Sequence, residues 1–172
     1  MDAVMAANCN ALVPAALVAS WTINDIEEWF TMGQWTRKHA ARLRSLKLPL
    51  PWPEKGMTDQ QAHFAITLVG VGVLAAAAAG VKSQGRSSFY RSSVLAFGLH
   101  GLTHLGQVAL FRGYTPGSIT AVLAVLPFWA WAEHCRKRNG ADLYTLREVF
   151  GACAIIAGLV PIVGLAGRVV RR

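Results

Sequence analysis

Charged residues are scarce in this 172-residue chain, at 15% of the sequence, whereas hydrophobic residues make up 53%. A typical soluble domain has roughly 25% charged residues, so the deficit argues against a soluble protein. The chain also lacks a Gly-rich nucleotide loop and a CxxCH haem signature. Its three cysteines are widely spaced, with no CxxC pair and no even number, so they indicate neither a zinc knuckle nor a disulfide framework. Lys and Arg are absent from residues 1–12, which argues against a cleaved signal peptide.

Long apolar runs, in contrast, recur along the whole chain. A helix of about 20 apolar residues crosses the hydrocarbon core of a bilayer. We therefore predict an all-α, polytopic membrane helical bundle that forms a single domain over residues 1–172, with about five transmembrane helices and no internal repeat. The predicted spans are residues 12–32, 62–81, 92–111, 118–132 and 149–170.

Local signals mark where several of these helices begin. Residues 58–61 and 145–148 match the Thr-x-x-Gln/Glu capping box, in which the two side chains bond each other's backbone N–H groups. Thr115 followed by Pro116 predicts an N-cap and the first residue of the fourth helix. Pro127 predicts a kink in that helix, because proline lacks the N–H of the helical hydrogen bond.

The net charge of +8 comes from Lys and Arg residues that lie mostly between the apolar runs. This placement is typical of membrane topology signals and headgroup contacts, and it argues against nucleic acid as a partner. Residues 34–47 predict a basic amphipathic helix on the membrane surface, with anionic headgroups as partners of residues 37–47; a solvated linker is the alternative. Ten of the 17 basic residues fall on one predicted side, which favours the N-terminus outside and the C-terminus inside.

Asn24, Glu27 and Glu28 interrupt the first predicted span. A charged side chain at the centre of a bilayer costs about 2.5–3.5 kcal/mol on insertion scales, so acids here need partners or a function. Spacings of three and four residues place all three side chains on neighbouring parts of one helix surface.

Histidines in the other spans are the candidate partners. His100, His104 and Gln107 share one face of the third predicted helix, and His63 lies at the start of the second. In the predicted topology His63, His104 and Gln107 lie at the depth of the two glutamates, with His100 near mid-membrane. Glu133 and His134 would lie at the other side of the bilayer.

Carboxylates and imidazoles at helical spacing inside a bundle are ligands for a divalent metal such as Fe, Zn or Mn. They also supply acid and base for proton transfer. A purely structural role, in which the polar groups hydrogen-bond one another and hold the helices together, is the third alternative. The residue types leave all three open.

The chain resembles the HXXEE family of small bacterial membrane proteins, named for a His-x-x-Glu-Glu motif in the first helix. The resemblance extends over about residues 21–127 and implies a bacterial cytoplasmic membrane and a polar site. The motif's His position is Asn24 here, which puts the ligand set in doubt. The matching residues are Glu27, Glu28, Trp29, His100, His104, the segment 112–117, Thr120, Ala121, Leu126 and Pro127.

Two classes of function follow. The first is a membrane-embedded enzyme that acts on a lipophilic small molecule: an isomerase or cyclase needs only proton delivery, whereas a hydroxylase needs a redox metal. The second is a non-catalytic transporter or accessory subunit with a packing network, for which a homo-oligomer remains open. In the enzyme hypothesis, the catalytic candidates are Asn24, Glu27, Glu28 and Gln107, and the metal ligands are Glu27, Glu28, His63, His100 and His104.

Overall fold

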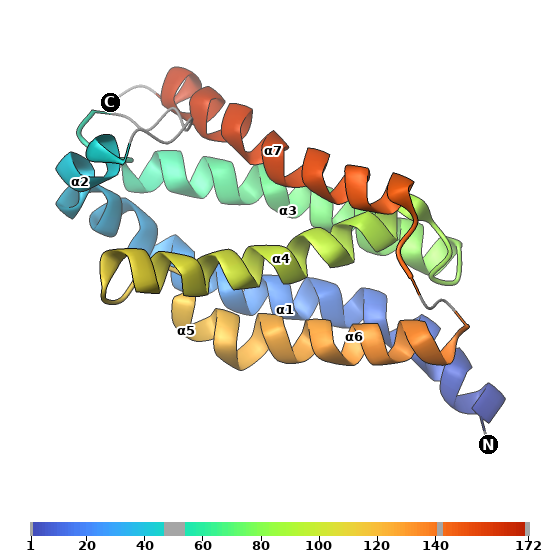
Figure 1. Ribbon diagram of the computed structural model, residues 1–172. Coiled ribbons are helices and arrows are strands. Elements are labelled where there is room, and N and C mark those ends of the chain that lie inside the picture. The colour runs from blue at the N-terminus through green and yellow to red at the C-terminus, as the bar shows by residue number, and fades with distance from the viewer. Residues whose placement is uncertain (1, 47–53, 141–142, 171–172) are drawn as a thin grey trace.

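The computed structural model describes residues 2–46, 54–140 and 143–170, with side chains described from residue 11 onward. Within these residues all regular structure is helical, as the sequence predicted (Figure 1). The elements are α1 (Asp2–Lys38), α2 (Ala40–Ser45), α3 (Asp59–Lys82), α4 (Ser88–Phe111), α5 (Ser118–Thr120), the π-helical turn η1 (Ala121–Val125), α6 (Leu126–Arg138) and α7 (Leu146–Val169).

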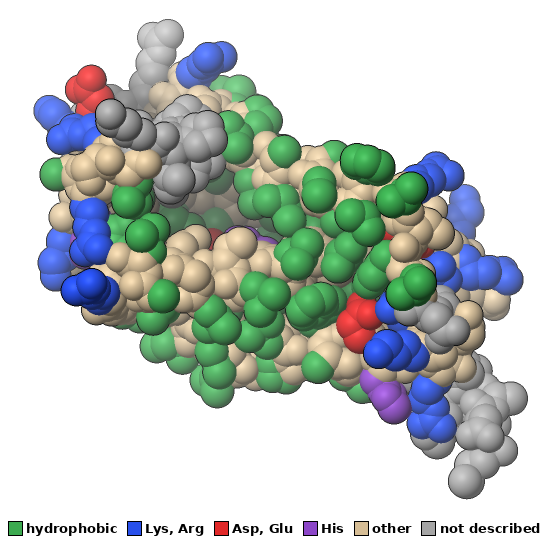
Figure 2. All heavy atoms as spheres, viewed as in Figure 1, with side chains coloured by type: hydrophobic (Ala, Val, Ile, Leu, Met, Phe, Trp, Pro, Cys, Tyr) green, Lys and Arg blue, Asp and Glu red, His purple; other side chains and the backbone are tan. Residues whose placement is uncertain are grey.

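Three of these helices, α3, α4 and α7, are long and apolar enough to cross a membrane. They coincide with the second, third and fifth predicted spans. Many of their large apolar side chains face outward, including Val71 and Leu74 on α3 and Phe150 on α7. Figure 2 shows how apolar side chains cover the middle of the molecule while Lys and Arg gather toward its two ends.

Both predicted capping boxes are present. Thr58 accepts the N–H of Gln61 at the start of α3, and the Gln61 side chain accepts the N–H of Thr58 in return. Thr145 and Glu148 exchange the same two bonds at the start of α7. Each box satisfies two of the backbone donors that a helix start leaves without an intrahelical partner.

The start of the fourth helical segment differs from the prediction. Thr115 is not its N-cap: Gly117, with a left-handed φ of 77°, takes that place and offers no side chain to the first turn. The expected irregularity near Pro127 takes the form of η1, which widens the helix by one residue per turn just before the proline. Since Pro127 has no N–H to donate, a change of register here avoids a lost bond in a regular helix.

The predicted surface helix over residues 34–47 is also different. Residues 34–38 continue α1, and only α2, after a break at His39, forms a separate short helix. Lys47 and the proline-rich segment that follows it lie outside the described residues. Arg37 binds the carbonyl of Met57, and Arg42 binds the carbonyl of Leu110, so part of the basic surface is used to hold the chain's own turns.

The helices pack through glycines that receive aromatic rings. A Cβ atom on Gly70 of α3 would lie 2.5 Å from the Trp21 ring of α1, and one on Gly98 of α4 would lie 2.2 Å from Trp129 of α6. The main apolar core is shared by α1, α4, η1 and α6. Its buried members are Val13, Leu17, Tyr90, Val94, Phe97, Val125, Phe128, Ala132 and Cys135.

The bundle has two distinct ends. The α2 end carries α2, the turn between α4 and α5, and the end of α7, where Gln61 binds the carbonyl of Val170. The opposite end carries the turns before α4 and α7, where Ser92 of α4 binds the carbonyl of Glu148. Helix α7 therefore packs on α4 at the opposite end and on α3 at the α2 end (Figure 1). Toward the α2 end α4 separates from α3 and α7, and Figure 2 shows a hollow there with acidic and histidine atoms at its floor.

Two glycines of α3 test this packing. We expect Gly70→Ala to destabilise the fold by about 1–3 kcal/mol, because its methyl group overlaps the Trp21 ring. Gly72→Ala is the matched control: it meets no atom within 4 Å, and it should stabilise the helix by about 0.5–1 kcal/mol. Unfolding in mixed micelles with increasing denaturing detergent measures both. Equal effects of the two variants would contradict the close α1–α3 contact.

Candidate metal or acid–base site

Helix α1 carries the first part of the site on its buried side. Asn24 and Glu28 are four residues apart, so they stand one above the other on one face. Asn24 is fully buried and Glu28 is 6% exposed. The site therefore begins with a carboxylate and an amide that water hardly reaches.

Helix α4 supplies the second part through the same four-residue spacing. The Nε2 atoms of His100 and His104 lie 3.0 Å apart, and they lie 3.9 and 3.3 Å from Oε1 of Glu28. Three potential ligand atoms from two helices thus converge within 4.8 Å of one another. His104 is buried, whereas the His100 side chain is 29% exposed.

This spacing fits a bound metal ion. A tetrahedral ion with bonds of ~2.0–2.1 Å holds its ligands ~3.3 Å apart, close to the His104–Glu28 separation. Imidazole nitrogen with carboxylate oxygen is a donor set that Zn, Fe and Mn accept. The group Glu28, His100 and His104 can therefore hold a metal ion.

The turn between α4 and α5 closes the site from one side. A Cβ atom on Gly117 would lie 2.5 Å from Cε1 of His104 and 2.7 Å from Oε1 of Glu28. Only a residue without a side chain leaves the His104–Glu28 contact intact here. On the other side of the ring, Nδ1 of His104 is buried and makes no hydrogen bond of ordinary geometry, although the backbone of Pro116 lies beside it.

Glu27 faces a different set of groups. Its carboxylate accepts the Tyr114 hydroxyl at 2.9 Å, and it accepts the backbone N–H and the hydroxyl of Thr120 at 2.8 and 2.6 Å. Thr120 is the third residue after the N-cap Gly117, so its N–H is one of the donors that a helix start leaves unpaired. Glu27 thus acts as the missing cap of α5, from a different helix.

Asn24 lies between these two glutamates. Its Oδ1 is 3.4 Å from the Thr120 hydroxyl, whose proton is already donated to Glu27. Its Nδ2 makes no hydrogen bond of ordinary geometry, although the Glu28 carboxylate lies beside it. A buried amide with an unpaired donor is costly, so this position is not optimised for packing alone.

The structure places the other two candidates away from the group. His63 stacks on Trp29, with ring centroids 3.7 Å apart, and its Nε2 donates to the Trp29 carbonyl at 3.0 Å. Gln107 is half-buried, about one turn beyond His104 toward the end of α4. Neither belongs to the group that converges on Glu28.

Sequence reasoning assigned no role to Asp25 or Gly117, and both belong to this region. Asp25 is 8% exposed and stands three residues from Glu28, so one more buried carboxylate lies beside the group. The i,i+3 spacing to Glu28 was a usable signal for Asp25. The close approach of Gly117 comes from the folded turn, and the sequence shows only a Pro-Gly pair.

Comparison with known proteins gives a family and no activity. The family model described as "Protein of unknown function with HXXEE motif" matches residues 15–132. No curated protein and no solved structure matches the chain. The matched segment contains α3 and α4 whole, with every residue discussed for the site.

Two glycines with the same backbone conformation test the role of the α4–α5 turn. Gly117 and Gly140 have φ angles of 77° and 76°, so an alanine is strained to a similar degree at either position. Only Gly117→Ala also pushes into His104 and Glu28, since Gly140 has no atom within 4 Å of an added Cβ. We expect Gly117→Ala to weaken Co²⁺ or Zn²⁺ binding by about 10-fold or more, the size of other near-ligand changes, and Gly140→Ala to leave it unchanged.

Titration of the purified variants with Co²⁺, followed by visible absorption, makes the measurement. Equal affinities in the two glycine variants would show that the turn does not shape the group.

Proposed function

This chain belongs to the HXXEE-motif family, and we propose that it is an integral membrane enzyme that acts on a lipophilic substrate. In this proposal Glu28, His100 and His104 bind a divalent metal ion. The observation that carries the proposal is the convergence of these three ligand atoms within 4.8 Å in an apolar bundle. Buried ionisable groups inside a membrane protein are costly, and they are retained mainly where they have a function.

Access to the site supports a lipophilic substrate. The hollow between α4 and the pair α3 and α7 opens on the apolar side of the molecule, near the α2 end (Figure 2). His100 is the partly exposed member of the group, and histidine atoms are visible at the floor of the hollow (Figure 2). A molecule dissolved in the bilayer can reach His100 through this opening without crossing water.

The residues divide into binding and positioning roles. Glu28, His100 and His104 hold the ion, Glu27 and Gly117 position Glu28 and His104, and Asn24 offers an amide beside the ligands. A bound Zn, Fe or Mn ion supplies Lewis acidity, and Fe or Mn also supplies redox chemistry for hydroxylation. Asp25, a buried carboxylate three residues from Glu28, is a further group that can take or give a proton.

A second candidate is metal-free proton transfer, and the histidine pair favours it. The two Nε2 atoms at 3.0 Å form a hydrogen bond only if one ring donates and the other accepts, so the pair holds one transferable proton between them. Glu28 lies 3.3 Å from His104, and the His100 side chain is 29% exposed. Such a relay can deliver a proton to an alkene or enol, as an isomerase or cyclase requires.

Metal analysis of the detergent-purified protein separates these candidates. We expect about one ion per chain in the unaltered protein, and loss of that ion in Glu28→Gln and in His104→Ala. Glu54→Gln is the matched control for the first variant, because Glu54 is exposed and does not belong to the group that converges on Glu28. His134→Ala, at an exposed position of the opposite end, is the control for the second.

The outcomes are distinct. Metal lost from Glu54→Gln and Glu28→Gln alike would contradict the assignment of Glu28 as a ligand. If the unaltered protein holds no metal and His104→Ala leaves its stability unchanged, then His104 has neither a metal-binding role nor a packing role. In the same series Asn24→His should raise the affinity by at least ~10-fold, since a third imidazole would stand one turn from Glu28, whereas Asn24→Ala adds no ligand.

We further propose five membrane spans, formed by α1, α3, α4, the α5–η1–α6 segment and α7, with the α2 end inside. The distribution of basic residues favours this orientation. Cys135, at the opposite end, is disulfide-bonded, and disulfides persist in oxidising compartments outside the cytoplasm.

Thiol labelling of whole cells tests the orientation. In a Cys153→Ser background, an impermeant maleimide should label Arg147→Cys directly and Arg44→Cys only after permeabilisation. Both positions are exposed, one at each end of the bundle. The reverse pattern would place the α2 end outside.

A further inference from the structure

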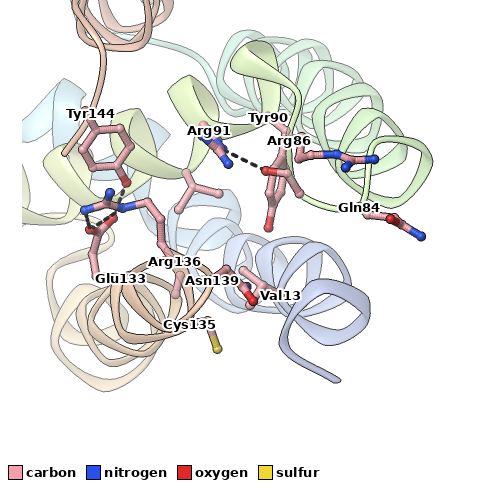
Figure 3. A pocket seen from close by; sticks show the side chains of 13 residues that line it. Val13, Gln84, Arg86, Tyr90, Arg91, Glu133, Cys135, Arg136, Asn139 and Tyr144 are labelled. Carbon is pink, nitrogen blue, oxygen red and sulfur yellow. Dashed lines mark hydrogen bonds and ion pairs between the residues drawn. The ribbon is translucent and has the colours of Figure 1, made fainter. Parts of the chain in front are cut away.

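A cavity lies at the opposite end of the bundle, away from His100 and His104. Its volume is about 270 Å³, and it is enclosed by the start of α4, the end of α6, the turn before α4 and the loop before α7 (Figure 3). Gln84, Arg86 and Asn139 along its border are exposed, so it opens to the surface at this end. Its wall includes three arginines, Arg86, Arg91 and Arg136, and one carboxylate, Glu133.

Two of the arginines are held in place by the protein. Arg136 binds Glu133 through Nε at 2.9 Å and Nη2 at 2.8 Å, and it stacks on the Tyr144 ring. Arg91 binds the Gly85 carbonyl at 2.9 Å and Glu148 at 3.4 Å. Their guanidinium groups are therefore positioned in the cavity wall before any ligand binds (Figure 3).

The single carboxylate of the wall is already neutralised. Glu133 accepts from Arg136 and from the Tyr144 hydroxyl. Burial, together with the bond to Glu133, raises the pKa of Tyr144, so that this hydroxyl stays protonated as a donor. Arg86, in contrast, donates only to the carbonyl of Ser83 among the described residues and has no carboxylate within ion-pair distance there. The cavity thus keeps a net positive charge.

Tyr90 adds a hydrogen-bond donor inside the cavity. Its side chain stands among the arginines and lines the wall (Figure 3). The residue is 5% exposed, and its hydroxyl has no hydrogen-bond partner among the described residues. A hydroxyl that lines a cavity without a protein partner is available to donate to a ligand or a water molecule there.

We propose that this cavity binds a phosphate-type oxyanion, held by Arg86, Arg91, Arg136 and the hydroxyl of Tyr90. Guanidinium groups present a planar set of donors that matches phosphate oxygens, and bonds to charged groups are the strong ones. A cation would meet three arginines, and an apolar ligand would offer no acceptor to the Tyr90 hydroxyl or to the Arg86 guanidinium.

Two sources of this anion fit the position. The cavity lies at an end of the bundle, where apolar helices give way to Lys and Arg, which is the level of phospholipid headgroups (Figure 2). An anionic lipid could therefore place its phosphate here while its chains lie along the helices. A free phosphate from the aqueous side presents the same oxygens. A lipid also contacts the apolar surface through its chains, whereas free phosphate does not. The affinities for a phospholipid and for inorganic phosphate therefore distinguish the two sources.

Binding measurements on delipidated protein in detergent test the proposal. The probes are inorganic phosphate, a short-chain phosphatidylglycerol and a short-chain phosphatidylcholine, followed by native mass spectrometry and by the shift in thermal unfolding. We expect one bound anion per chain. Arg86→Gln should lower the affinity for this anion about 10-fold or more, because it removes one charge-assisted contact. Tyr90→Phe, which keeps the ring, should lower it several-fold.

Arg147→Gln is the matched control, because Arg147 is exposed at the same end and does not line the cavity. Its affinity should equal that of the unaltered protein. Preference for phosphatidylglycerol over inorganic phosphate identifies a lipid headgroup, and the reverse identifies a soluble anion. Absence of binding by all probes, or equal loss in Arg86→Gln and Arg147→Gln, would overturn the proposal.

Discussion

The contact between Glu27 and Thr120 holds the candidate site together. Helix α5 is only three residues long and begins at Gly117, which has no side chain to cap it. Its start is stable because Glu27 of α1 takes the Thr120 N–H and hydroxyl, and a carboxylate at a helix start is also favoured by the helix dipole. Through this bond the turn that carries Gly117 is pressed against His104, so the histidine and Glu28 meet.

Two adjacent glutamates thus have different tasks. Successive residues of a helix point about 100° apart, so Glu27 and Glu28 cannot face the same partners. Glu27 meets three donors and is satisfied as a carboxylate. Glu28 meets two imidazole nitrogens, whose protons and lone pairs are shared with each other. The adjacent pair thus lets Glu27 hold the neighbouring segment in place while Glu28 stays available to the two histidines.

The sequence predicted those parts of the structure that depend on neighbours in the chain. The capping boxes at residues 58–61 and 145–148 and the shared face of His100 and His104 are local patterns, and the structure contains them. The apolar runs also predicted that Glu28 on α1 and His104 on α4 lie at the same level of the bundle, and the two side chains meet in the structure. His63 shows the limit of this reasoning: it has a suitable depth, yet it faces Trp29, because depth does not determine which side of a helix a neighbour occupies.

Features that depend on the folded turns were not accessible in this way. The N-cap assigned to Thr115 was reasonable from residue type, but the cap of α5 comes from Glu27, 93 residues away from Thr120. The register change at η1 and the clash that any side chain at Gly117 would cause both arise from packing between segments. Likewise, the break at His39 divides a basic stretch that reads as one helix in the sequence.

Asn24 gives the proposed metal site its character. Structural metal sites are closed by four protein ligands, whereas catalytic sites keep three ligands and an open position. On our proposal Glu28, His100 and His104 are the three, and a histidine at position 24, as the family's motif has it, would stand where a fourth ligand can approach. Asn24 is buried there with an unpaired Nδ2. An amide is a weak ligand but a good hydrogen-bond partner, so it leaves the fourth position to a water or a substrate and can orient what binds. On the same proposal, Asn24 lowers the affinity for the metal ion and leaves a coordination position for a molecule that enters from the hollow.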